Sequence, residues 1–329
     1  MLSKLSTAIR TLREDGAVSL LKHIRSDLFP ARDRLREARG PSTDIYDCFI
    51  FYNEVEVLKL RLNELDDVVD KFVLVEATET FQGDDKELHF EQNREQFADF
   101  EDRIIHHVVE YPENLTSAWE REYYLRDSIH EALKIKSNIS PEDELIISDA
   151  DEVPRPRAVE RGVNTSGIKI LSQSLHYYYF NYVLDGGSLW LGPVMSKYRD
   201  LTSPQDFRDR YTQHREDIGG VPERPYLFVL QLLLSVGNQR RVTILPDAGW
   251  HFSYIGDVEY MIDKIETFSH TELNEEQFKD RERIERAIAN GRDLFGEGLR
   301  FNAIDVGERL PAYLRVNEAE FSDYLYRDG

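Results

Sequence analysis

The sequence predicts an α/β protein whose mostly parallel sheet is flanked by helices. Between residues 45 and 151, apolar runs typical of buried strands alternate with segments of helical periodicity. This alternation indicates strand–helix–strand units with right-handed crossovers, which generate parallel strands and a nucleotide-binding type of architecture. The second half is less regular, with aromatic-rich, strand-like runs separated by Gly and Pro.

The elements can be predicted in order along the chain. In the first half we expect strands over 45–52, 71–77, 102–110 and 143–151, with helices over 54–70 and 117–135. Thr116 or Ser117 is a suitable N-cap for the second helix, with Glu120 in its first turn. In the second half we expect strand-like segments over 175–184, 188–198 and 241–256, and a helix over 258–267. A last helix should run from residue 274 or 275 to 290, with Gly291 as its C-cap.

Composition sets limits on the kind of protein. The chain has 329 residues, 41% of them hydrophobic, and a single cysteine, Cys48, which excludes an internal disulfide framework. No run is long and apolar enough for a transmembrane helix, and the N-terminus lacks a signal-peptide core. A net charge of −21 argues against nucleic acid as a partner. With 11 Lys, 30 Arg and 62 acids, the surface suits a salt-loving source, which unfolding at low salt would support and a salt-independent melting temperature would refute.

The N-terminal residues differ from the rest in charge. Residues 1–40 carry +4 and show roughly helical apolar spacing, so we expect an amphipathic helical arm there. Such an arm either lies on an anionic membrane or packs on the domain or on a second subunit. Liposome flotation with and without residues 1–40 separates these alternatives. We therefore divide the chain into this arm, a domain over 41–300 and a C-terminal tail over 301–329.

The strongest chemical signal is Asp149-Ala150-Asp151-Glu152, directly after an apolar strand. In parallel sheets ligands gather beyond the carboxyl ends of the strands. Two carboxylates at i and i+2 in that place can face one cation, and their hard oxygens suit Mn²⁺ or Mg²⁺ with substrate phosphates completing the shell. The alternative is a solvated acidic turn or a helix N-terminus. Glu152 would serve such a site from outside or only solvate the turn.

Other side chains are weaker candidates. His251 alternates with Trp250 and Phe252, so it should face away from them and is available to a metal or a diphosphate. The aromatic run 176–183 and Trp190 either stack on sugars or form core. Three arginines are candidates for phosphate contacts or for helix-surface salt bridges: Arg94, Arg121 and Arg126. The sequence contains no P-loop, GxSxG or dinucleotide fingerprint.

The block FIFYNEVEVLKLRLNELDDVVDKFVLVEATETFQG resembles the opening of glycosyltransferase family 17, which includes the enzyme that adds the bisecting N-acetylglucosamine to N-glycans. The segments SAWEREYYLRD, ISDADEVPRP, AGWHFSYIG and KIETFSHTE are similar to further blocks, so the resemblance spans about residues 45–295. It implies a GT-A-type fold, a nucleotide-sugar donor (UDP-N-acetylglucosamine in this family) and inversion at the anomeric carbon. It also implies that Asp149 and Asp151 bind metal and diphosphate, with His251 joining the metal.

The resemblance extends to the donor site. It implies that Glu76 contacts uridine and that Phe51, Asn53 and Glu54 lie near the nucleoside. The animal enzymes carry a membrane-anchor helix at the N-terminus, so we expect here a prokaryotic-type enzyme, cytoplasmic or peripheral at the inner face of the membrane. We expect it to act on a glycan or glycolipid, with a homo-oligomer left open.

The expected chemistry is an in-line displacement in which a carboxylate deprotonates the acceptor hydroxyl. The candidate bases are Asp185, Asp247, Glu266 and Glu272. One rival is a sugar nucleotidyltransferase or metal phosphohydrolase, although the acidic YNEVE after the first strand does not suit the Gly-rich basic loop of the former. The other rival is a non-catalytic glycan-binding protein of the same fold.

Overall fold

The structure is a computed structural model that describes residues 43–186, 189–212, 242–296 and 298–327. From Asp44 onward these residues belong to one compact unit. The arm predicted over residues 1–40 lies outside the described residues. Among the helices that are described, none has the length and apolar character needed to cross a membrane.

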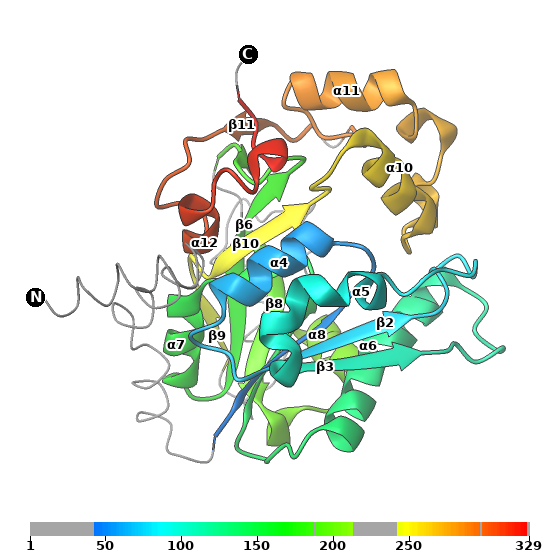
Figure 1. The fold of residues 1–329 in the computed structure, drawn as a ribbon. Helices are drawn as coiled ribbons and strands as arrows, with labels where there is room; N and C mark the ends of the chain where they lie inside the picture. The colour runs from blue at the N-terminus through cyan, green and yellow to red at the C-terminus, as the bar shows by residue number, and fades with distance from the viewer. Residues whose placement is uncertain (1–42, 187–188, 213–241, 297, 328–329) are drawn as a thin grey trace, which may run out of the picture. The chain divides into compact units, whose positions relative to one another are not determined.

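The first half of this unit follows the predicted alternation (Figure 1). Its strands are β1 (Ile45–Ile50), β2 (Lys71–Ala77), β3 (Ile104–Val109), β4 (Glu144–Asp149) and β5 (Glu152–Pro154). Its helices are α4 (Val55–Glu64), α5 (His89–Asn93), the 3-10 helix η1 (Arg94–Arg103), α6 (Ala118–Lys136) and α7 (Pro156–Val163).

As far as the structure describes it, the second half contains six strands and four α-helices. Its strands are β6 (Ile168–Tyr177), β7 (Tyr182–Leu184), β8 (Leu189–Lys197), β9 (Val242–Leu245), β10 (Gly249–Ser253) and β11 (Phe301–Ala303). Its α-helices are α8 (Pro204–Thr212), α10 (Val258–Thr267), α11 (Arg281–Ala289) and α12 (Ala312–Val316). Short 3-10 turns complete it at η2 (Tyr198–Asp200), η4 (Thr271–Leu273), η5 (Glu276–Phe278) and η6 (Ser322–Tyr324).

The sheet is mixed, which corrects the prediction of a mostly parallel one. Strands β3, β2, β1 and β4 are parallel neighbours in that order, but β8 joins β4 antiparallel and β6 joins β8 antiparallel. Of the ten pairings among the described strands, five are parallel and five antiparallel. The reason is that no helix separates β6, β7 and β8, and strands joined without a crossover run antiparallel.

The two faces of β1 pack against different helices. Tyr46, Cys48 and Ile50 face α6 within one hydrophobic cluster, and the alternate residues Asp47 and Phe49 face α4, where both contact Arg61. All six residues of β1 are buried, and β2 is buried from Phe72 onward. This two-sided burial explains why the strands appear as continuous apolar runs in the sequence.

Several predicted boundaries are confirmed and others shift. β2 and α10 have the predicted bounds, and α6 begins with a capping box between Ser117 and Glu120. α4 ends at Glu64, six residues early. α11 begins at Arg281 because Asp280 caps it by accepting from the backbone N–H of Arg283.

The aromatic run 176–183 belongs mainly to the core. Tyr177, Tyr178 and Tyr182 pack in one cluster that also contains Phe301 of β11, and Phe180 packs in another beside Trp250 and Phe252. The predicted C-terminal tail is part of this packing, since β11 pairs with β7 and the residues beyond it supply four core side chains: Leu310, Leu314, Phe321 and Leu325. The domain fold therefore continues past residue 300.

Candidate functional site

The acids of the motif lie where the carboxyl ends of three parallel strands meet. Asp149 pairs with Ile50 at the end of β1, and Ile50 pairs with Val75 near the end of β2. β4 ends at Asp149, so Ala150 and Asp151 form a turn before β5. The backbone N–H of Phe252 in β10 donates to the carbonyl of Asp151 at 2.8 Å, which ties this turn to β10.

Two arginines hold the carboxylate of Asp149. Arg126 of α6 donates to Oδ1 at 2.9 Å and Arg208 of α8 donates to Oδ2 at 2.7 Å. Burial opposes ionisation, but Arg208 and Arg126 outweigh it and lower the pKa of Asp149 to about 2. Asp149 is thus a fixed anion whose two oxygens are both in ion pairs.

Asp151 has a different environment. Its Oδ2 accepts from Lys264 Nζ at 3.0 Å, and its Oδ1 lies 3.5 Å from His251 Nε2. Burial is again outweighed, here by Lys264 and His251, which keep the pKa of Asp151 below its ordinary value. His251 faces away from the core side chains of Trp250 and Phe252, as predicted, and its ring contacts that of Trp190 at a tilt of 35° with centroids 4.0 Å apart.

Glu152 is the most enclosed of the three acids. Arg208 binds its carboxylate through both terminal nitrogens at 2.6 and 2.8 Å, Trp190 Nε1 donates to Oε1 at 2.6 Å, and the backbone N–H of Asp149 donates to Oε2 at 3.0 Å. The exposed fraction of Glu152 is 0%, so its carboxylate is not in contact with water. Gly192 makes room for it, because a Cβ there would lie 2.0 Å from Oε1 of Glu152.

Beneath the turn lies Arg61 of α4, which was not among the predicted site residues. This fully buried arginine binds Asp47 through two hydrogen bonds of 2.6 and 2.7 Å. It also donates to the carbonyls of Asp149, Ala150 and Glu152 at 2.8, 3.0 and 3.1 Å. A signal existed: Asp47 interrupts an apolar strand and Arg61 interrupts the apolar face of the next helix, which suggests a buried pair.

The predicted nucleoside contacts separate into exposed and enclosed groups. Phe51 is 2% exposed and Glu76 is 0% exposed, and Glu76 accepts from the backbone N–H groups of His89 and Phe90 at the start of α5. Asn53 and Glu54 follow β1 and are partly exposed. Asn53 and Glu54 therefore have access to a ligand, whereas Glu76 has a structural role in holding α5.

Helix α10 contacts the segments that follow β1 and β4. Asp263 accepts from Asn53 at 2.9 Å and from the hydroxyl of Tyr52 at 3.4 Å. Lys264, one residue on, reaches Asp151. Just after the helix, Ser269 donates to Glu122 of α6, which also binds Arg126.

The four candidate bases lie outside the acid cluster, by which we mean Asp149, Asp151 and Glu152 together with the side chains that bind them. Asp185 and Glu272 are exposed, and Glu272 accepts from His270 at 2.7 Å. Asp247 pairs with two arginines and Glu266 with Lys279. The two other predicted phosphate ligands also lie outside it: Arg94 pairs with surface acids, and Arg121 donates to a backbone carbonyl at 3.2 Å.

The side chains present fit a divalent cation only in part. Within the described residues no three His, Cys, Asp or Glu side chains form a metal-binding group. Asp151 and His251 do face each other, and Nδ1 of His251 is buried without a hydrogen-bond partner. A carboxylate and an imidazole supply two ligands, which suits an ion that substrate phosphates and water complete. Asp149 would join only if one of its ion pairs opened.

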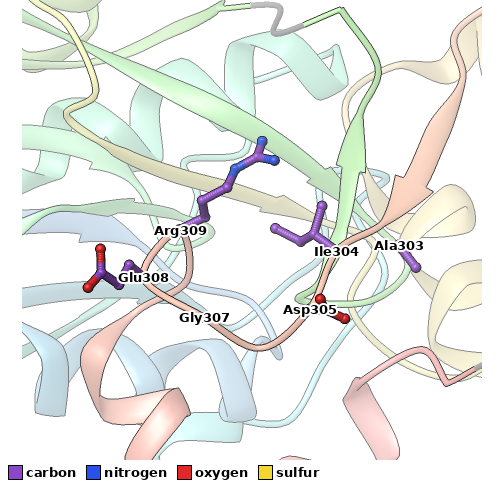
Figure 2. Close-up of a pocket in the computed structure, with 6 residues that line it drawn as sticks. All are labelled: Ala303, Ile304, Asp305, Gly307, Glu308 and Arg309. Carbon is purple, nitrogen blue, oxygen red and sulfur yellow. The ribbon is translucent and has the colours of Figure 1, made fainter.

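A separate hollow of about 480 Å³ follows β11 (Figure 2). Its lining includes Asp305, Glu308 and Arg309, and the Arg309 side chain points away from that of Glu308 in Figure 2. None of the residues of the acid cluster lines it, so this hollow is separate from the turn.

Comparison with known proteins supplies the family. The sequence model of glycosyltransferase family 17 matches residues 34–211 and 236–300. The beta-1,4-mannosyl-glycoprotein 4-beta-N-acetylglucosaminyltransferases of rat and human are each 31% identical to this chain over 133 residues, and that of mouse is 30% identical. Each match covers 38% of this chain and 24% of the relative. With the family pattern spanning most of its length, this chain belongs to glycosyltransferase family 17.

Proposed function

We propose that this chain is an inverting, metal-dependent glycosyltransferase that moves N-acetylglucosamine from its UDP donor to a hydroxyl of a glycan or glycolipid. The observation that carries the proposal is the acid cluster at the carboxyl ends of β1 and β4, in a member of this family. The sugar is taken from the names of the relatives. We assign a GT-A-type fold on the parallel β3–β2–β1–β4 half of the sheet with the acidic motif after β4.

Asp151 and His251 would hold Mn²⁺ or Mg²⁺ together with the donor's phosphates. When bound, such an ion stabilises negative charge on the leaving diphosphate. Arg126 and Arg208 keep Asp149 ionised and oriented, and Arg61 fixes the carbonyls of the turn. The chain's contribution is therefore a rigid arrangement that holds the diphosphate in line for displacement.

In the reaction, the bond between the anomeric carbon and the diphosphate oxygen breaks as the bond to the acceptor oxygen forms. The electron pair of the broken bond leaves on the diphosphate, and the proton of the acceptor hydroxyl passes to a carboxylate. The four candidate bases lie outside the acid cluster, so their positions do not single one of them out as the base. Substituting each by its amide in a transfer assay would identify it.

The test is a donor-hydrolysis and UDP-binding assay with Mn²⁺ or Mg²⁺, comparing UDP-sugars with GDP-sugars. We expect Asp151→Asn to abolish metal-dependent UDP binding and hydrolysis while the fold is kept. Asp305→Asn, at an exposed aspartate beyond β11, is the matched control and should behave as the wild type.

Three outcomes would contradict the proposal. A fully active Asp151→Asn chain would refute the metal assignment. Release of diphosphate from nucleoside triphosphate and sugar phosphate would instead favour the nucleotidyltransferase, and UDP-sugar binding without turnover would favour the non-catalytic glycan-binding protein.

A further inference from the structure

Lys264 occupies a special position in the acid cluster. It lies on α10, which Asp257 caps by accepting from the backbone N–H of Tyr260 at 2.8 Å. Its Nζ lies 3.0 Å from Asp151 Oδ2 and 4.0 Å from Glu54 Oε1. The ammonium therefore sits between an acid that follows β4 and an acid that follows β1.

The hydrogen-bonding capacity of this ammonium is largely unused. An ammonium carries three N–H donors. Within the described part of the chain only Asp151 lies at hydrogen-bond distance from it, since the 4.0 Å to Glu54 is too long. The side chain is 17% exposed, so one side of it remains open. A largely buried ammonium with unused N–H donors suits a ligand that supplies negatively charged oxygen atoms.

The arginines of the cluster are more fully committed. Arg126 binds Glu122 and Asp149, and Arg208 binds Asp149 and Glu152. Each of these guanidiniums thus shares its single positive charge between two carboxylates at hydrogen-bond distance. Lys264 has one carboxylate at hydrogen-bond distance, so its positive charge is the least compensated of the three.

The position of Lys264 is also fixed from its own helix. The neighbouring Asp263 holds Asn53 and Tyr52 after β1. A ligand reaching from the end of β1 to Asp151 would therefore pass Lys264. Helix α10, which carries Lys264, thus contacts both the residues after β1 and Asp151.

We propose that Lys264 binds the β-phosphate of the nucleotide-sugar donor beside Asp151 and stabilises the charge that the leaving diphosphate acquires. This assignment rests on the proposed function, since it names a substrate contact of the same site. Lys264 is then a cation supplied by the chain, acting at the same leaving group as the divalent ion. Its β-phosphate contact distinguishes UDP from UMP, which lacks that phosphate.

The experiment measures UDP and UMP binding to the full chain by calorimetry in the presence of Mn²⁺. We expect Lys264→Met to weaken UDP binding about 10- to 100-fold, the range for hydrogen bonds to a charged group. UMP binding should change by less than about threefold. Lys279→Met is the control, because Lys279 follows the same helix but pairs with the surface acids Glu266 and Glu276.

The outcomes separate this inference from the proposed function. If Lys264→Met binds UDP as the wild type does, or loses UDP and UMP affinity equally, the β-phosphate contact is refuted while UDP-sugar hydrolysis by the wild type still supports the function. If the wild type binds no nucleoside diphosphate, both are refuted. Should the methionine variant fail to fold, Lys264→Gln keeps a polar end for Asp151 and is expected to show the same selective loss.

Discussion

Replacing Arg61 by methionine tests how the acidic turn is held. The change leaves the Asp47 carboxylate, which is 0% exposed, without the guanidinium that binds it through two hydrogen bonds. It also removes the donor from the carbonyls of Asp149, Ala150 and Glu152. Breaking a buried ion pair by removing one partner costs about 3–5 kcal/mol. That is a large part of the roughly 5–15 kcal/mol by which a domain is stable.

The origin of this loss can be isolated with a second substitution. If the unpaired buried charge dominates, Asp47→Leu combined with Arg61→Met should recover about 2 kcal/mol or more of the free energy of unfolding relative to Arg61→Met alone. The double variant should still bind UDP and Mn²⁺ weakly, because the carbonyls of the turn remain without their donor.

The assay is urea denaturation of the wild type, both single variants and the double variant, with UDP binding measured on each folded chain. A double variant as unstable as Arg61→Met would show that the charge on Asp47 is not the main term. A single variant that loses less than about 1 kcal/mol would refute the assignment of Arg61 as the buried support of the turn.

Two further predictions address the surroundings of the cluster. Gly192→Ala should break the hydrogen bond between Glu152 and Trp190 and lower both the melting temperature and the UDP affinity, because the new Cβ would lie 2.0 Å from Glu152 Oε1. Gly307→Ala, whose new Cβ would have its nearest contact at 3.8 Å, is the control and should be neutral. A neutral Gly192→Ala would contradict this packing. Burial lowers the pKa of His176 to about 3, so between pH 6.5 and 3 the unfolded chain binds the extra proton and stability falls as the pH falls. Between pH 6.5 and 4.5, the free energy of unfolding of His176→Gln should therefore fall by about 2 kcal/mol less than that of the wild type. Thermal unfolding at both pH values measures this, and an unchanged pH profile would refute a neutral His176.

The sequence predicted those elements whose local signals agree with their packing. β2 lies between β1 and β3 and is buried on both faces, so its apolar run marks both of its ends. α6 carries its own capping box, and α10 carries a capping aspartate and an apolar stripe. The place of Asp149 and Asp151 followed from the same logic, because the carboxyl ends of parallel strands meet at one edge.

What the sequence did not predict depends on contacts between distant segments. The antiparallel pairing of β8 with β4 joins residues 194–197 to residues 144–147, which are distant in the chain. Arg208 lies 56 residues beyond Glu152, in a helix that was not predicted. No local periodicity marks such a partner, so the sequence left open whether Glu152 serves the site from outside or only solvates the turn.

The packing of residues 301–327 has a consequence for the opposite side of β10. Trp250 Nε1 donates to the carbonyl of Arg309 at 2.7 Å, and Phe252 shares a cluster with Leu310, Leu314 and Phe321. These two aromatic side chains flank His251 in the sequence and point to the other face of its strand. Residues 301–327 thus hold in place the face of β10 opposite His251, and shortening the chain there should misalign the His251 imidazole through its own strand.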